Sequence, residues 1–200
     1  MLICIHSTYL RYRMRIQIGQ RPANDFSNPL GLLSDCHRRI EHFLQVLLAI
    51  AAQATDGTLP RQYSRELEAA LTYFSVAAPH HTADEESSVF PRLRATDDVA
   101  AARVLETLDR LERDHEEADQ LHRQVDGLGR RWLSDGRLGE DDVAALRTHL
   151  QRLDAIYREH IGIEDRELFP VAARLLSSSE LHDVGREMAE RRSLRVPSTT

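Results

Sequence analysis

Cysteines, long apolar runs and basic stretches are scarce in this chain, and each absence excludes a class of protein. The 200 residues include only Cys4 and Cys36, too few to define the disulfide framework of a small secreted domain. No apolar run approaches the roughly 20 residues that span a bilayer, so we expect no membrane partner. The net charge of −6 comes without a long basic run, so nucleic acid is not an expected partner.

The start of the chain also lacks the features of a secretory signal. The apolar stretch from Met1 to Ile5 is short, and Arg11 and Arg13 follow soon after it. Together with the low cysteine content, this predicts a cytoplasmic location. The overall composition, 42% hydrophobic and 29% charged, is that of a globular protein with room for one sizeable core.

Helical periodicity begins at residue 29 and returns along most of the chain. Apolar stripes predict one helix from Pro29, capped by Asn28, to about residue 54, and a second from about 62 to 93. Pro79 lies inside the second and predicts a kink or break just before the residue that follows it. A third helix is predicted from about Asp97 to a breaker-rich stretch that begins at Gly127 and includes residues 129 and 134–136, and a fourth starts near residue 140.

Four long amphipathic helices with short connections predict an all-α fold, an antiparallel up-down-up-down four-helix bundle over residues 29–176. Residues 177–200 are expected to hold a short extra C-terminal helix, from about Ser179 to Arg191, and a tail. Residues 1–28 end in Pro, Asn, Asp and Ser breakers and are interpreted as an N-terminal extension and linker.

One sequence pattern occurs twice. Residues 80–91 read HHTADEESSVFP and residues 159–170 read EHIGIEDRELFP. Both contain a His, three residues, a Glu, an acid, two residues, an aliphatic residue, Phe and Pro. A His and a carboxylate four residues apart share one helix face and can bind one metal ion. A single HxxxE occurs readily by chance, but the long pattern twice indicates a function.

Each copy follows a helix with one further histidine on its apolar stripe, so the chain reads as two similar helical hairpins. The six candidate metal ligands are His37, His81, Glu85, His115, His160 and Glu164. Two buried ionised carboxylates would cost several kcal/mol unless neutralised or bound to metal. A vestigial, water-filled site is the alternative. Four imidazoles and two carboxylates favour iron, manganese or zinc, and suit two metals bridged by both glutamates, with open positions for a small ligand.

The two motifs resemble those of the hemerythrin-like (HHE cation-binding) domain family over about residues 30–175. The resemblance implies a four-helix bundle with two oxo- or hydroxo-bridged iron ions, manganese or zinc being less favoured, and it makes the same six residues the iron ligands. Oxygen-carrying members have a second histidine where this chain has Asp119, and their last carboxylate aligns with Asp165. The pattern therefore resembles the carboxylate-rich bacterial branch of the family more than the reversible oxygen carriers.

Several further polar residues are candidates for supporting roles. Glu41 and Asp119 each lie four residues after a candidate histidine. We interpret them as groups that orient an imidazole, with direct ligation as the alternative. Glu86 and Asp165 are predicted at the bundle edge. His122 either lines the cavity or sits in the core, two readings that the sequence leaves open.

The expected function is binding or sensing of dioxygen, nitric oxide or redox state, with the signal passed to a protein partner. The alternative is a di-iron enzyme, a peroxidase or an oxidase of nitric oxide or ferrous iron, because Asp119 in place of histidine leaves room for exogenous ligands such as peroxide. Iron storage or repair of iron centres ranks last, since the related repair family carries an N-terminal cysteine-containing domain and only Cys4 precedes this bundle. The sequence leans away from an enzyme without deciding the matter.

Overall fold

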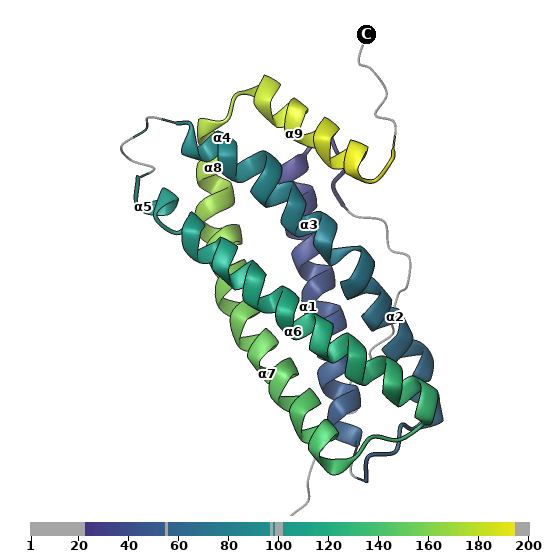
Figure 1. Ribbon diagram of the computed structural model, residues 1–200. Helices are drawn as coiled ribbons and strands as arrows, with labels where there is room; N and C mark the ends of the chain where they lie inside the picture. The colour runs from purple at the N-terminus through teal and green to yellow at the C-terminus, as the bar shows by residue number, and fades with distance from the viewer. Residues whose placement is uncertain (1–22, 55, 97, 99–101, 195–200) are drawn as a thin grey trace, which may run out of the picture.

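The computed structural model describes residues 23–54, 56–96, 98 and 102–194, which fold into a bundle of long helices (Figure 1). No β-strand occurs in this part of the chain, so the predicted all-α class is confirmed. The elements in chain order are α1 (Pro29–Gln53), the 3-10 turn η1 (Arg61–Tyr63), α2 (Ser64–Val76), α3 (Ala78–Asp84), the π-helical turn η2 (Glu85–Val89), α4 (Phe90–Arg94), α5 (Ala102–Leu105), α6 (Leu108–Asp135), α7 (Glu140–Ile163), the π-helical turn η4 (Glu164–Leu168), α8 (Phe169–Leu175) and α9 (Ser178–Arg191).

Four columns of helix make up the bundle. They are α1, the run from α2 through η2 to α4, α6, and the run from α7 through η4 to α8. The closest neighbours are α1 with α2, α2 with α6, α6 with α7, and α7 with α1, so the columns form a closed ring in chain order. Figure 1 shows them side by side, with α9 lying across one end. The predicted bundle is therefore confirmed. Among the described helices, none is both long and apolar enough to cross a bilayer.

The boundaries of the first two columns follow their predicted signals. The Asn28 side chain accepts a hydrogen bond from the Gly31 amide at 3.2 Å, and Pro29 occupies the first helical position. In the second column, α2 ends at Val76 and α3 begins at Ala78, with Pro79 in its first turn. The predicted break before His80 is confirmed, because proline has no amide hydrogen to continue the helical bonding.

The third column differs from its prediction. Asp97, the predicted start, lies outside the described residues, and the long helix α6 begins only at Leu108. Gly127 and Gly129 do not end it, because tertiary packing outweighs their weak helix propensity. A Cβ atom at Gly129 would lie 2.7 Å from a methyl carbon of Leu71, so this glycine allows α2 and α6 to approach closely. The helix ends at Gly136, whose positive φ of 71° is the usual C-terminal cap conformation.

Two apolar clusters fill the bundle, and a polar layer separates them. The first cluster includes Leu44, Leu71, Trp132 and Leu150. The second, nearer α9, includes Leu33, Phe90, Leu108 and Met188. In every column a residue of the first cluster and one of the second flank the polar layer: Ile40 and Leu33, Ala78 and Val89, Ala118 and Leu111, and Ile161 and Leu168. The polar side chains of this layer are therefore closed off by apolar packing on both sides.

The predicted C-terminal helix is confirmed as α9. Ser177 caps it through a reciprocal arrangement with Glu180, and its apolar face packs on the second cluster. Arg191 and Arg192 donate hydrogen bonds of 2.8 and 2.7 Å to Asp84, a fully buried carboxylate at the end of α3. The predicted extension up to residue 22 and the tail after residue 194 lie outside the described residues.

Trp132 anchors the end of the bundle away from α9. Its side chain is fully buried, and the indole N–H donates a 2.8 Å hydrogen bond to the Gly57 carbonyl. The Leu138 amide also donates to this carbonyl, so Trp132→Phe removes one of its two hydrogen bonds and leaves a void. We expect the two effects together to lower the free energy of unfolding by about 1–3 kcal/mol. Urea unfolding measures the change. Val76→Ala, on an exposed side chain, is the control, and equal midpoints for the two variants would contradict the prediction.

Candidate metal centre

All six predicted site residues meet in the polar layer. His37 comes from α1, His81 from α3, His115 from α6 and His160 from α7, while Glu85 and Glu164 are the first residues of the two π-helical turns. Every one of these side chains is buried. They form two groups whose potential ligand atoms lie within 4.8 Å of one another: His37, His81, Glu85 and Glu164, and Glu85, His115, His160 and Glu164.

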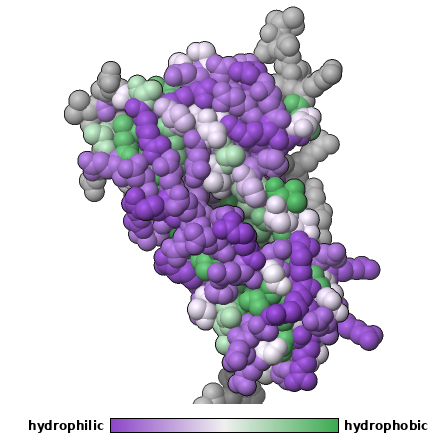
Figure 2. All heavy atoms as spheres, in the orientation of Figure 1, coloured by the Kyte–Doolittle hydropathy of each residue, from purple (hydrophilic) through white to green (hydrophobic). Residues whose placement is uncertain are grey.

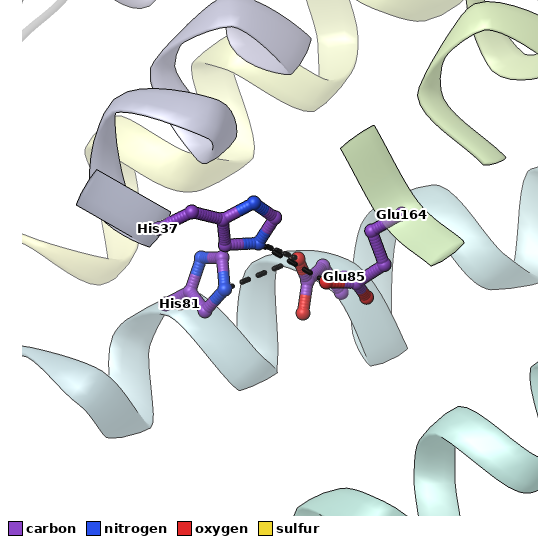
Figure 3. A group of neighbouring side chains, drawn as sticks. All are labelled: His37, His81, Glu85 and Glu164. Carbon is purple, nitrogen blue, oxygen red and sulfur yellow. Dashed lines mark ion pairs between the residues drawn. The ribbon is translucent and has the colours of Figure 1, made fainter. Parts of the chain in front are cut away.

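The two glutamates belong to both groups. Figure 3 shows both glutamates directed toward His37 of α1: Glu85 from the column that also carries His81, and Glu164 from the column of α7 and η4. The Glu164 Oε2 atom lies 3.0 Å from His37 Nε2 and 3.2 Å from His160 Nε2. One oxygen of Glu85 lies 3.3 Å from His81 Nε2, and its other oxygen lies 3.3 Å from His115 Nε2. Each carboxylate therefore lies between one histidine of the first hairpin and one histidine of the second.

The polar atoms of this layer that lack hydrogen-bond partners are suitable ligands for a cation. All four carboxylate oxygens of Glu85 and Glu164 are buried without a hydrogen-bond partner among the described residues. The Nε2 atoms of His37 and His115 share this property. Buried polar atoms without partners are costly, and two ionised carboxylates at one level repel each other. Cations placed between the glutamates and the imidazole nitrogens would satisfy both requirements at once.

A widened helical turn begins at each of these glutamates. The Phe90 amide donates to the Glu85 carbonyl five residues back, and the Phe169 amide does the same to Glu164. The following residue in each motif is a proline, which cannot donate and would clash with the carbonyl four residues earlier in a regular helix. Instead of ending, the helix accommodates each proline through one π-helical turn. Such turns are frequent at functional sites.

The acid that follows each glutamate orients an imidazole. Asp165 Oδ1 lies 2.9 Å from His37 Nδ1, and Glu86 Oε1 lies 2.8 Å from His115 Nδ1. Each bond crosses from one hairpin to the other. Both carboxylates are partly exposed at the bundle edge, as predicted, yet they also hold the imidazoles, a role that the sequence did not assign to them. An acceptor at Nδ1 fixes the tautomer that leaves Nε2 free for a metal.

Glu41 and Asp119, which were predicted to orient imidazoles, do not do so. Glu41 forms an ion pair with Arg38, and Asp119 forms one with Arg123, each on its own helix. Their side chains are 50% and 62% exposed. A spacing of four residues places a carboxylate near a histidine along one helix, whereas the Nδ1 atoms face the neighbouring helices. That interpretation was therefore wrong, because the orienting bonds cross between columns.

The four imidazoles differ in their protonation. Burial lowers the pKa of His115, but the neighbouring carboxylates of Glu85 and Glu86 raise it more, to about 10. Burial lowers the pKa of His81 to about 4, and its Nδ1 atom has no partner within the described structure. The Nδ1 atom of His160 lies 3.6 Å from Asp114, an ion-pair contact longer than a hydrogen bond. The pair on α6 and α7 therefore has more carboxylate support than the pair on α1 and α3.

We expect Asp165→Asn to weaken metal binding by about 10- to 100-fold, because the amide cannot hold the His37 imidazole as a carboxylate does. The affinity for Mn²⁺ or Zn²⁺ is measured by competition with a coloured chelator. Asp119→Asn makes the same chemical change outside the two groups and should keep the original affinity. Equal affinities for the two variants would show that the Asp165 bond does not serve metal binding.

A cavity of about 270 Å³ adjoins the layer between α3, α6 and α7. Its wall includes three site histidines, His81, His115 and His160, and apolar side chains. His122 and Tyr157 also line it, which answers the question left open for His122. The face of the protein in Figure 2 is mostly hydrophilic, with separate hydrophobic patches.

Two comparisons with known proteins match this chain. A model of the hemerythrin HHE cation binding domain matches residues 28–172, a segment that includes both histidine–glutamate groups. An uncharacterised protein of Haemophilus influenzae is 27% identical over 171 residues, which cover 85% of this chain and 93% of the relative. The relative's description names no activity, and the family match points to a cation at the polar layer.

Proposed function

Since the chain belongs to the hemerythrin HHE cation-binding domain family, we propose that it is a non-haem di-iron protein that binds dioxygen or nitric oxide, or responds to redox state. The observation that supports this most is the sharing of Glu85 and Glu164 between two histidine pairs. His37 and His81 would hold one metal, and His115 and His160 the other. Both glutamates would bridge.

The donor chemistry supports a transition metal such as iron over calcium or magnesium. Four imidazole nitrogens and carboxylate oxygens are typical ligands of non-haem iron, while calcium and magnesium prefer oxygen alone. No cysteine belongs to either group of described residues, and the Cys36 Sγ atom instead accepts a 3.1 Å hydrogen bond from Arg39. When bound, the metal pair supplies redox change and open positions for a small ligand.

The protein's own residues prepare this chemistry. Asp165 and Glu86 accept the Nδ1 hydrogens of His37 and His115, so that both Nε2 atoms stay directed inward. The apolar clusters close the layer off from both ends of the bundle. The cavity beside His81, His115 and His160 offers a small molecule a way to the layer.

Metal content and the ultraviolet–visible spectrum test the proposal directly. Protein purified aerobically from iron-supplemented cells should contain about two irons per chain. It should also show the charge-transfer bands of an oxo-bridged iron pair near the blue edge of the visible spectrum. Titration of the reduced protein with dioxygen and nitric oxide should then give stoichiometric spectral changes. One metal per chain, zinc alone, or none after iron reconstitution would overturn the paired centre.

An enzyme is the second candidate, and the cavity favours it. A space of about 270 Å³ exceeds what a diatomic molecule occupies, and its wall includes the hydrogen-bonding side chains of His122 and Tyr157. Steady-state consumption of hydrogen peroxide separates the candidates. Many turnovers per iron pair indicate a peroxidase, while a single spectral change indicates a binding protein.

Metal affinity should rise with pH. The pKa of His115 is about 10 in the metal-free protein, so this imidazole is protonated at neutral pH and must lose a proton to bind metal. Raising the pH toward 10 removes this competition, and we expect affinity to increase by about tenfold per pH unit for each proton released. Zn²⁺ titrations in weak buffer measure both affinity and proton release. An affinity that does not vary with pH would contradict the prediction.

A further inference from the structure

Tyr157 and His122 form a hydrogen-bonded pair on the wall of the cavity. Tyr157 lies on α7 and His122 on α6, and the phenol oxygen is 2.9 Å from the imidazole Nε2. The same cavity is lined by His81, His115 and His160 of the candidate metal centre. The pair therefore shares a small space with any molecule that reaches the centre.

The pair has a hydrogen-bond donor that the contact between its two members does not use. Burial lowers the pKa of His122 to about 4 and raises that of the Tyr157 phenol, so both groups are neutral. Together they carry one O–H and one ring N–H, and the contact between them uses only one. The His122 Nδ1 atom is buried and has no partner in the described part of the chain. In either tautomer, one donor therefore has no acceptor among the described residues.

Packing holds this donor in place. The His122 ring stacks on Phe74, with ring centroids 4.1 Å apart and an interplanar angle of 22°. This stacking restrains the imidazole, so its Nε2 atom stays beside the phenol. When Nε2–H donates to the phenol oxygen, the phenol O–H is free to turn to an acceptor in the cavity.

We propose that Tyr157, supported by His122, donates a hydrogen bond to a small anion or oxygen-containing ligand held in the cavity beside the metal centre. The inference rests on the proposed function, because the ligand would sit next to the two histidine–glutamate groups. Ile40, Ala118 and Ile161 add an apolar wall to the same cavity. A buried donor whose hydrogen no described residue accepts favours a ligand that has lone pairs over an apolar one.

Azide binding to the iron-loaded protein tests the proposal. Tyr157→Phe removes the phenol donor and should weaken azide binding by about tenfold, as loss of one hydrogen bond to an anion predicts. Tyr73→Phe is the matched control, because the Tyr73 hydroxyl donates to the Cys36 carbonyl and Tyr73 does not line this cavity. It should leave the azide affinity unchanged. Absorbance titration gives the affinities, and iron content is measured first on every sample.

The outcomes separate the two proposals. Equal azide affinity for Tyr157→Phe and the original protein would overturn the donor role. Loss of iron from Tyr157→Phe would also overturn it, because the phenol would then serve the metals. Failure of the iron-loaded original protein to bind azide would exclude an anion in the cavity. An original protein that takes up no iron would instead refute the proposed function.

Discussion

Glu85→Gln will reduce the bound metal from about two ions per chain to fewer than one. One oxygen of Glu85 faces His81 and the other faces His115, so a single change removes a charged ligand from both groups. A neutral amide also fails to balance the charge of two divalent cations in a buried layer. His81→Ala, in contrast, changes one group only and should leave one metal bound. Elemental analysis after dialysis measures the difference.

The control for this comparison is Glu41→Gln, which makes the same substitution on a half-exposed residue paired with Arg38. It should bind as much metal as the original protein. If Glu85→Gln lost only one ion, the two groups would be independent mononuclear sites, and the sharing of the glutamates would have no role in binding.

Removing the metals will lower the melting temperature by about 10–20 °C. A ligand present at 100 times its dissociation constant stabilises the folded state by about 2.7 kcal/mol, so two ions contribute about 5 kcal/mol. For a domain of this size, 1 kcal/mol shifts the melting temperature by about 2–4 °C. The physical source is the set of buried oxygen atoms of Glu85 and Glu164 that otherwise have no partner.

Circular dichroism melts with and without a chelator measure this shift. Glu85→Gln supplies the control, because a protein that holds little metal should hardly respond to the chelator. Identical melting temperatures for the original protein in both conditions would indicate a vestigial layer that holds water, the alternative that the sequence had left open.

The bundle was predictable because its signals are local and repeated. Apolar stripes, the Asn28–Pro29 start and the break at Pro79 depend on neighbouring residues, and the structure reproduces them. The convergence of the six polar side chains followed from a motif that occurs twice, each copy after a helix with one further histidine. Gly129 was misjudged because its role lies in contact with Leu71, a residue far away in the chain.

The orienting carboxylates could not be found by helical spacing. Glu86 and Asp165 bond imidazoles on neighbouring columns, and their positions depend on the wide turns that precede Pro91 and Pro170. A signal for them was nevertheless present. An acid follows the glutamate in both copies of the motif, and a repeated feature that helical faces do not explain indicates a contact across helices.

The sharing of the glutamates between the two hairpins has a consequence for how the chain is joined. The hairpin of α1 and α3 supplies His37, His81 and Glu85, but not Glu164. The hairpin of α6 and α7 supplies His115, His160 and Glu164, but not Glu85. Neither half could assemble a complete group alone. A bound metal pair would therefore act as a removable cross-link between the halves of the chain. It would add to the peptide connection and to the hydrogen bonds that Arg191 and Arg192 donate to Asp84.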